Sequence, residues 1–508
     1  MSKKLDRRQI LARLGLLGLT PQMVFSACTK KTATTTRQDT PRSLEGFSNG
    51  EDRKFLFVFG AMGGASINDS FLAVKESECD YSEILNAFPD DWVKEVEGSP
   101  LRAVDLTMDD IGPLPFPVKS HQSKFLEKYH KEIMVTTMEH STVSHPLGQK
   151  RVITGNGAWN GRTIQEIVAD TYGRDLVLPN VNMSSLGYAE PGTDPTLPKD
   201  AVAELISSPT FFGLGLHGYK GLSGVPDKAL IDIARRYRSK IERNSDFYKT
   251  YASNSRLQRW LKLRNQKQPT IEKMNLIEKI NIFEDSTSLP FKDFGIEANE
   301  TGELVREMFP DVGADPLHTQ GALAYMMVSQ GISNAVTFGM GMNVTINGNN
   351  PDNPLLTNTP TGFDYSHNAH RATQALLWNR TFDIIDRLIT LLKKTEMPEG
   401  GTIWDRSMIM IATEFGRDKE RPENAEDYPS GHHQNNGIAV ISPLVNGGKV
   451  LGGVDPNTLL TYGYDPKTGK LDKNRQMTEK EVFAGLLQAL GVDTSPADLP
   501  EVPIMKRS

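Results

Sequence analysis

Five short apolar runs in this chain are continuous, with few polar residues among them. They cover residues 55–59, 133–137, 335–338, 408–412 and 438–441. A strand has this pattern when helices bury both faces of a parallel sheet. Apolar residues at helical spacing lie between the runs, around residues 164–168, 376–392 and 479–490. The alternation of strand and helix predicts an α/β fold.

Residues 227–309 contain no such run and have a helical pattern instead. Leu230, Ile233, Tyr237 and Ile241 recur at helical spacing, and basic residues lie among them. We expect a mainly helical insertion that packs on the sheet domain and keeps its basic face in solvent. A membrane-surface role for the basic face is the alternative.

The composition is typical of a globular protein and excludes some partners. The chain has 508 residues, of which 38% are hydrophobic and 24% charged. Its 57 Lys and Arg residues stand against 63 Asp and Glu residues, for a formal net charge of -6, and no long basic tract is present. Nucleic acid is therefore not an expected partner.

Residues 1–27 have the features of an export signal. A basic start that includes Arg7 and Arg8 precedes a short apolar stretch, and small residues precede Cys28. The arginine pair resembles a twin-arginine signal, and residues 25–28 resemble a bacterial lipobox. We expect export to the periplasm or cell surface and a lipid anchor on Cys28. An ordinary cleaved signal or an amphipathic N-terminal helix is the alternative.

The rest of the chain divides into a tether and a large domain. Residues 28–52 are too polar to order themselves, so we expect a flexible tether. Residues 53–508 form the α/β domain, with the helical insertion at about 227–309. The chain has only two cysteines, Cys28 and Cys79, so lipidation of the first leaves no internal disulfide.

Six of the ten histidines occur as close pairs beside predicted strands. The pairs are His140 with His145, His367 with His370, and His432 with His433. Because ligands of open α/β sheets gather at the carboxyl ends of strands, we expect the pairs to converge. Simple solvent exposure of each loop histidine is the alternative.

Asp364 lies close in sequence to the second histidine pair. Carboxylate oxygen and neutral imidazole nitrogen are common zinc ligands. If a helix begins near His367, then His367 and His370 lie one turn apart on one face and could bind one ion. Alternatively, Asp364 caps that helix and the histidines face solvent.

A polar turn follows the apolar run at residues 408–412. It carries Glu414, a candidate ligand or base, and Arg417, which could hold an anionic group through two hydrogen bonds. An ion pair between Glu414 and Arg417 is the alternative. His432 and His433 follow after a short insert.

Four segments together resemble the exported bacterial family called domain of unknown function 1501. They are residues 57–63, 362–364, 413–417 and 447–452, in order over most of residues 53–495. That family is similar in fold to the alkaline phosphatase and sulfatase superfamily. The resemblance implies a three-layer domain with a mainly parallel central sheet. It also implies one or two metal ions held by Asp and His, and ester hydrolysis through a Ser, Thr or modified Cys nucleophile.

The resemblance implies that one metal position is retained, for a divalent and zinc-like ion. Its candidate ligands are Asp364, His367, His370, His432 and His433. The second position is impaired, since Gly63 replaces an Asp and Glu414–Phe415 replaces an Asp-His pair. Asp69 could substitute there.

The same comparison places His145 where the nucleophile should stand, because residues 151–155 resemble the end of the nucleophile segment. Attack by a metal-bound water is then the simpler chemistry. Ser144 is the rival nucleophile, with His145 as its base. A structural role for Ser144 in the turn before Pro146 is the third possibility.

Two functions follow from these features. The first is a metal-dependent envelope hydrolase of phosphate or sulfate esters, in which Glu414 or His145 moves protons and Arg417 offsets anionic charge. The second is a non-catalytic envelope lipoprotein of the same fold that binds a protein partner or a glycan. Fold analogy alone does not choose between them.

Overall fold

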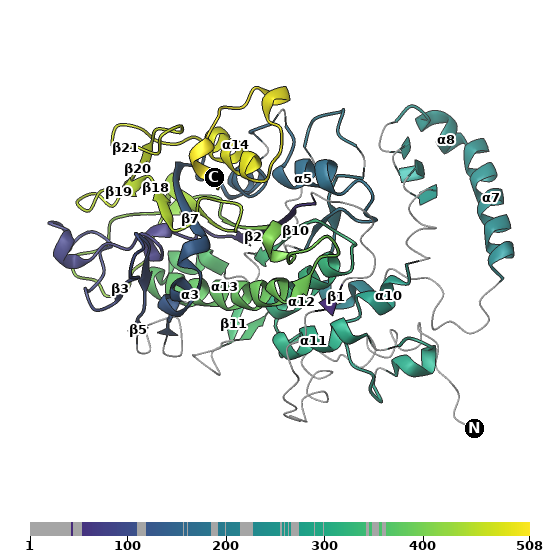
Figure 1. Ribbon diagram of the computed structural model, residues 1–508, viewed down its shortest axis with the longest axis horizontal. Coiled ribbons are helices and arrows are strands. Elements are labelled where there is room, and N and C mark those ends of the chain that lie inside the picture. The colour runs from purple at the N-terminus through teal and green to yellow at the C-terminus, as the bar shows by residue number, and fades with distance from the viewer. Residues whose placement is uncertain are drawn as a thin grey trace. The chain divides into compact units, whose positions relative to one another are not determined.

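The structure is a computed structural model, and two compact units make it up (Figure 1). One unit spans residues 37–209 and 308–508, and the other takes in residues 210–307. The described residues are 42–43, 53–108, 118–155, 157–159, 161–183, 192–198, 200–213, 227–254, 257–258, 260–262, 264–265, 274–288, 290–297, 299–341, 345–347, 355–357 and 362–507. The predicted export signal, Cys28 and all of the predicted tether except residues 42–43 lie outside these residues.

A mixed sheet of eight strands forms the centre of the larger unit. Its order is β18-β7-β17-β14-β2-β10-β8-β9. The strands are β2 (Phe55–Ala61), β7 (Ile133–Glu139), β8 (Asn180–Asn182), β9 (Glu204–Leu205), β10 (Ala335–Met340), β14 (Ser407–Ala412), β17 (Asn435–Ile441) and β18 (Lys449–Leu451). All five predicted apolar runs lie in this sheet. The three short strands β8, β9 and β18 were not predicted.

One predicted strand runs against the others. β17 pairs antiparallel with both β14 and β7, whereas the remaining neighbours pair in parallel. Every residue of β17 is buried, so its continuous apolar pattern reports burial and carries no information on direction. The prediction of a mainly parallel sheet therefore holds, with β17 as the exception.

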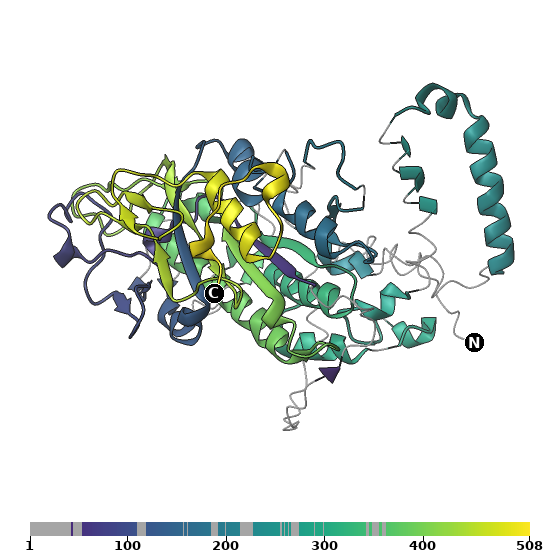
Figure 2. The same ribbon diagram turned by 45° about the horizontal axis from the view of Figure 1, so that its top comes forward.

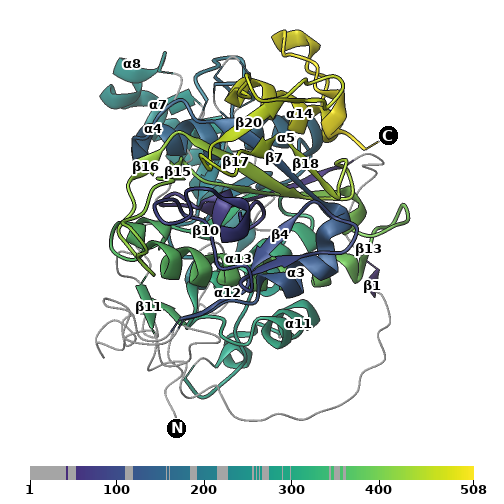
Figure 3. The ribbon, with the colours of Figure 1, turned by 90° about the vertical axis from the view of Figure 1, so that its left-hand side faces the viewer.

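Helices cover both faces of the sheet (Figure 3). On one face, Leu56 and Val58 of β2 share a core with α5 (Ile164–Tyr172) and α14 (Glu479–Ala489). On the other face lie α12 (Pro316–Ser329) and α13 (His370–Lys393). The three helices predicted from spacing are confirmed as α5, α13 and α14.

Local signals in the sequence fix where these helices begin. Thr163 precedes α5 and Thr478 precedes α14. The hydroxyl of each threonine accepts a hydrogen bond from the backbone N–H of the glutamate three residues later, and that glutamate's carboxylate accepts one from the backbone N–H of the threonine. Asp315 caps α12 and also binds Arg380 of α13 in the interior. The buried pair joins the two helices that lie side by side beneath the sheet.

The smaller unit is helical in the residues that the structure describes. Its α-helices are α7 (Lys228–Asn244), α8 (Asp246–Tyr251), α10 (Leu276–Lys279) and, except for its last residue, α11 (Glu300–Met308). α7 is the long teal helix of Figure 2. No described helix has the length and apolar character needed to cross a bilayer. Leu230, Ile233, Tyr237 and Ile241 of α7 are exposed. The packing of this insertion on the sheet domain stays a prediction.

Candidate metal centre

Polar side chains converge at one edge of the central sheet. β7, β14 and β2 end at this edge, and the antiparallel β17 begins there. His145 opens the short helix α4 (His145–Gly148) after β7, and Glu414 follows β14. His432 lies in β16 (His432–His433) just before β17. Asp364 lies in the 3-10 helix η7 (Gly362–His367).

Four of these side chains surround one point. They are His145, Asp364, His367 and His432, whose ligand atoms all lie within 4.8 Å of one another. The Oδ1 atom of Asp364 lies 3.2 Å from Nε2 of His145, 3.4 Å from Nε2 of His367 and 3.8 Å from Nε2 of His432. The Nε2 atoms of His367 and His432 are 2.8 Å apart. This cluster could hold a metal ion.

The spacing suits a tetrahedral zinc-like ion. Ligands about 2.0 to 2.1 Å from such an ion lie about 3.3 Å from one another. Four of the six separations within the cluster range from 2.8 to 3.8 Å and are centred on that value, and all six are at most 4.8 Å. Three imidazoles and one carboxylate are also a donor set that zinc accepts.

Hydrogen bonds orient two of the imidazoles for this role. His145 donates from Nδ1 to Oε1 of Glu414 at 2.8 Å, and His432 donates from Nδ1 to the carbonyl of Val143 at 3.0 Å. A proton on Nδ1 leaves the Nε2 lone pair free to face the cluster, as in known histidine metal sites. Phe415 stacks on the His432 ring with centroids 4.0 Å apart and fixes its plane.

The charges of Asp364 and His145 determine how a cation could enter the cluster. Burial disfavours a charged Asp364, yet the hydrogen bonds from His145 and His432 and the charge of Arg417 keep its pKa well below the usual value. Burial also opposes a charge on His145, but bonds to Asp364 and Glu414 outweigh it and raise its pKa to about 9. At neutral pH, an entering cation must therefore displace a proton from His145.

Glu414 lies behind the cluster rather than in it. Its side chain is fully buried, and Oε1 accepts hydrogen bonds from Gly63 N at 2.9 Å and from Gln149 as well as from His145. This carboxylate therefore positions His145. The ion pair between Glu414 and Arg417, which was the alternative for this turn, does not form; Arg417 pairs with Asp364 at 3.1 Å.

The guanidinium of Arg417, in β15 (Gly416–Arg417), is buried and every nitrogen has a partner. Nε and Nη2 donate to the carbonyl of Gly63, Nη1 to the carbonyl of Ser430 at 3.1 Å, and Nη2 also to Asp364. Nη1 also lies 3.3 Å from Nε2 of His367. These contacts tie the end of β2 to η7, and a role of Arg417 in holding an anionic ligand stays a prediction.

Two predicted ligands lie elsewhere. η7 ends at His367, and Ala369 has an extended backbone, so His370 starts a new helix and does not share a face with His367. His370 is fully buried and pairs through Nε2 with Asp69 at 3.1 Å, which leaves both residues outside the cluster. His433 accepts a hydrogen bond from the backbone of Asn435 through Nδ1 and is not one of the four.

Ser144 precedes α4 and is exposed. No hydrogen bond joins its hydroxyl to any of the four cluster residues. His145, predicted as catalytic, is one of the four candidate ligands. Sequence reasoning missed Gln149, Phe415 and the Val143 carbonyl as supports of the cluster. Phe415 and Val143 lie next to the candidate residues Glu414 and Ser144.

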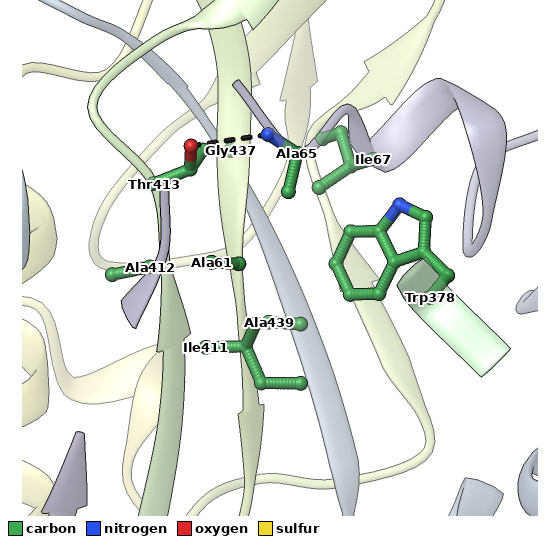
Figure 4. A pocket seen from close by; sticks show the side chains of 9 residues that line it. All are labelled: Ala61, Ala65, Ile67, Trp378, Ile411, Ala412, Thr413, Gly437 and Ala439. Carbon is green, nitrogen blue, oxygen red and sulfur yellow. Dashed lines mark hydrogen bonds between the residues drawn. The ribbon is translucent and has the colours of Figure 1, made fainter. Parts of the chain in front are cut away.

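A small hollow near this edge is not a substrate pocket. Ala61, Ile411 and Trp378 are among its lining residues, and the Thr413 hydroxyl accepts a hydrogen bond from Ala65 N there (Figure 4). Its walls are mostly apolar, and its interior has no space for a water molecule. We assign it to packing between the sheet and α13.

His140 supports Glu414 beneath the cluster and makes the stability of the protein depend on pH. Its ring is fully buried, and Nδ1 donates to the carbonyl of Glu414 at 3.0 Å. Burial lowers its pKa to about 4. As pH falls from about 6.5 to 4, the imidazole of His140 takes up a proton in the unfolded chain but stays neutral in the folded chain. We therefore expect the free energy of unfolding to fall by about 3 kcal/mol.

Urea unfolding at pH 7 and pH 4.5 measures this effect. His140→Asn keeps a donor for the Glu414 carbonyl and cannot become charged, so its stability should fall less than that of the wild type. Other titrating groups are common to both proteins and cancel in the comparison. An equal fall in both proteins would contradict the assignment.

Comparison of the whole chain with protein-family models, with curated proteins and with solved structures gave no match.

Proposed function

We propose that the chain is a metal-dependent hydrolase of phosphate or sulfate esters in the cell envelope. The observation that carries the proposal is the solvent-accessible cluster of His145, Asp364, His367 and His432. The side chains of His367 and Asp364 are 43% and 28% exposed, so an ester could reach an ion held there. A bound divalent ion would polarise an ester oxygen and lower the pKa of a nearby water.

The chain's own residues hold this arrangement in place. Glu414 fixes the ring of His145, and Arg417 holds the Asp364 carboxylate. The resemblance to the family of domain of unknown function 1501, and through it to alkaline phosphatases and sulfatases, supports the same reaction class. The mainly parallel sheet is compatible with a three-layer domain of that type.

A non-catalytic envelope lipoprotein that binds a protein partner or a glycan is the second candidate. The observation that favours it is the number of ligands, because four protein ligands complete a tetrahedral shell, whereas catalytic zinc sites keep a position open. The guanidinium of Arg417 already bonds to backbone carbonyls and to Asp364, and this also favours the non-catalytic function. A screen of the zinc-loaded protein against generic phosphate and sulfate esters separates the two functions: turnover supports the hydrolase, and bound metal without turnover supports the lipoprotein.

If the protein is a hydrolase, Ser144→Ala should lower turnover by less than about tenfold. Loss of a covalent serine nucleophile typically costs about ten thousandfold or more, and the Ser144 hydroxyl has no bond to the cluster. Steady-state kinetics on an ester substrate measures the effect. A trapped phospho- or sulfo-Ser144 adduct in mass spectrometry would overturn the mechanism without a protein nucleophile.

We also propose that the mature chain is anchored to the membrane by lipid on Cys28. The support is the apolar stretch before residues 25–28 and the polar segment after them. Fractionation of cells that express the wild type or Cys28→Ala tests this. Equal membrane retention of both proteins in high salt would contradict the anchor.

A further inference from the structure

α7 is an amphipathic helix whose apolar face lies in solvent. Leu230, Tyr237 and Ile241 are 57%, 64% and 68% exposed, and Ile233 is 40% exposed. At about 100° per residue, these four side chains fall within an arc of about 80° on the helix. Single exposed apolar residues are common, but a continuous stripe marks a surface that binds something.

Basic residues border this apolar stripe on both sides. In the helical projection, Arg238 lies beyond one edge, and Lys240 and then Arg236 lie beyond the other. Arg236, Lys240 and Arg243 form no ion pair in the part of the chain that the structure describes. Their charges are therefore free to meet an anionic surface.

The segment after α7 adds exposed aromatic side chains. Phe247 and Tyr251 of α8 are 63% and 49% exposed, and Trp260 is 53% exposed. The Arg264 guanidinium lies 4.2 Å from the centre of the Trp260 ring. Aromatic rings next to basic groups are typical of the headgroup level of a membrane.

We propose that α7 lies in the plane of an anionic lipid surface. The stripe of Leu230, Ile233, Tyr237 and Ile241 enters between the headgroups, and the bordering basic residues bind lipid phosphates. The chain as a whole carries a formal charge of -6, so such a surface attracts this helix and not the chain in general. The inference does not depend on the metal centre or on the proposed reaction.

Vesicle sedimentation of the full chain tests the proposal. All proteins carry Cys28→Ala, so that no lipid anchor is present, and they share the same N-terminal segment. The vesicles contain phosphatidylglycerol and phosphatidylcholine in equal parts, or phosphatidylcholine alone. We expect the double variant L230D/I241D to bind the anionic vesicles at least tenfold more weakly than its parent, because it places charge in the apolar stripe.

A second variant separates the electrostatic contribution. Replacing Arg236 and Lys240 with glutamine should weaken binding to the anionic vesicles about fivefold per charge at low salt, and leave binding to phosphatidylcholine unchanged. Leu471→Asp is the matched control, because Leu471 is 51% exposed on a strand of the larger unit. This control should bind as its parent does.

Two results would overturn the proposal. One is equal vesicle binding by L230D/I241D and its parent. The other is a dimer in analytical ultracentrifugation without lipid that L230D/I241D dissociates, since the stripe would then be covered by a second copy of the chain.

Discussion

Asp364→Ala is expected to abolish zinc binding and, with it, any ester hydrolysis. Asp364 is the only carboxylate in the cluster, and its Oδ1 atom lies within 3.8 Å of all three imidazole nitrogens. Changes to groups that merely support ligands already cost about 10- to 100-fold in metal affinity. We therefore expect the loss of this ligand to cost at least that much, which titration of the metal-free protein with zinc would measure.

The conservative variant Asp364→Asn distinguishes loss of the metal ligand from a folding defect. It keeps the side-chain volume and an oxygen for Arg417 but removes the negative charge, and it should still lose most of the affinity. Asp386→Asn is the control, since Asp386 lies on α13 and binds Lys128 and Tyr129, outside the cluster. Zinc binding by Asp364→Asn at wild-type strength would contradict the ligand assignment.

Gly63→Ala is expected to destabilise the protein by roughly 3 kcal/mol or more and to disrupt the cluster. Gly63 has a φ of 98°, which side chains other than hydrogen rarely accept, and a Cβ there would lie 2.0 Å from the backbone nitrogen of Asp364. Either Gly63 or η7 must move, and Asp364 moves with η7. Urea unfolding and zinc titration of the same variant measure the two effects.

Gly98→Ala is the matched control for the backbone cost. Gly98 has a φ of 72°, and nothing lies within 4 Å of its Cβ position, so the substitution should cost only about 1 to 2 kcal/mol. An equal cost for both variants would show that the contact with η7 does not matter. The same geometry leaves no room for an aspartate side chain at position 63 in this fold.

The sheet could be predicted because burial leaves a direct trace in sequence. Each apolar run forms a strand, because a central strand of a covered sheet buries every side chain of a run of about five apolar residues. The direction of β17 could not be predicted, because a strand buried on both faces has the same pattern in either direction. The edge strand β9 is two exposed residues long and has no apolar run to find.

The candidate site was predicted in part, and its errors have local causes. Convergence of Asp364, His367 and His432 followed from their positions beside strands at one edge. The exclusion of His370 depended on a break of two residues between η7 and α13, which apolar spacing does not reveal. The carbonyl partners of Arg417 could not be predicted, because Gly63 lies 354 residues away in the sequence and the backbone of Ser430, 13 residues away, carries no sequence signal.

Anomalous diffraction from crystals soaked in zinc tests the metal centre most directly. We expect one strong peak per chain, about 2.0 to 2.2 Å from Nε2 of His145, His367 and His432 and from a carboxylate oxygen of Asp364. The peak should be absent from crystals of Asp364→Ala. A fully soaked wild-type crystal with no peak among these four side chains, or with its zinc bound elsewhere, would contradict a metal centre at this cluster.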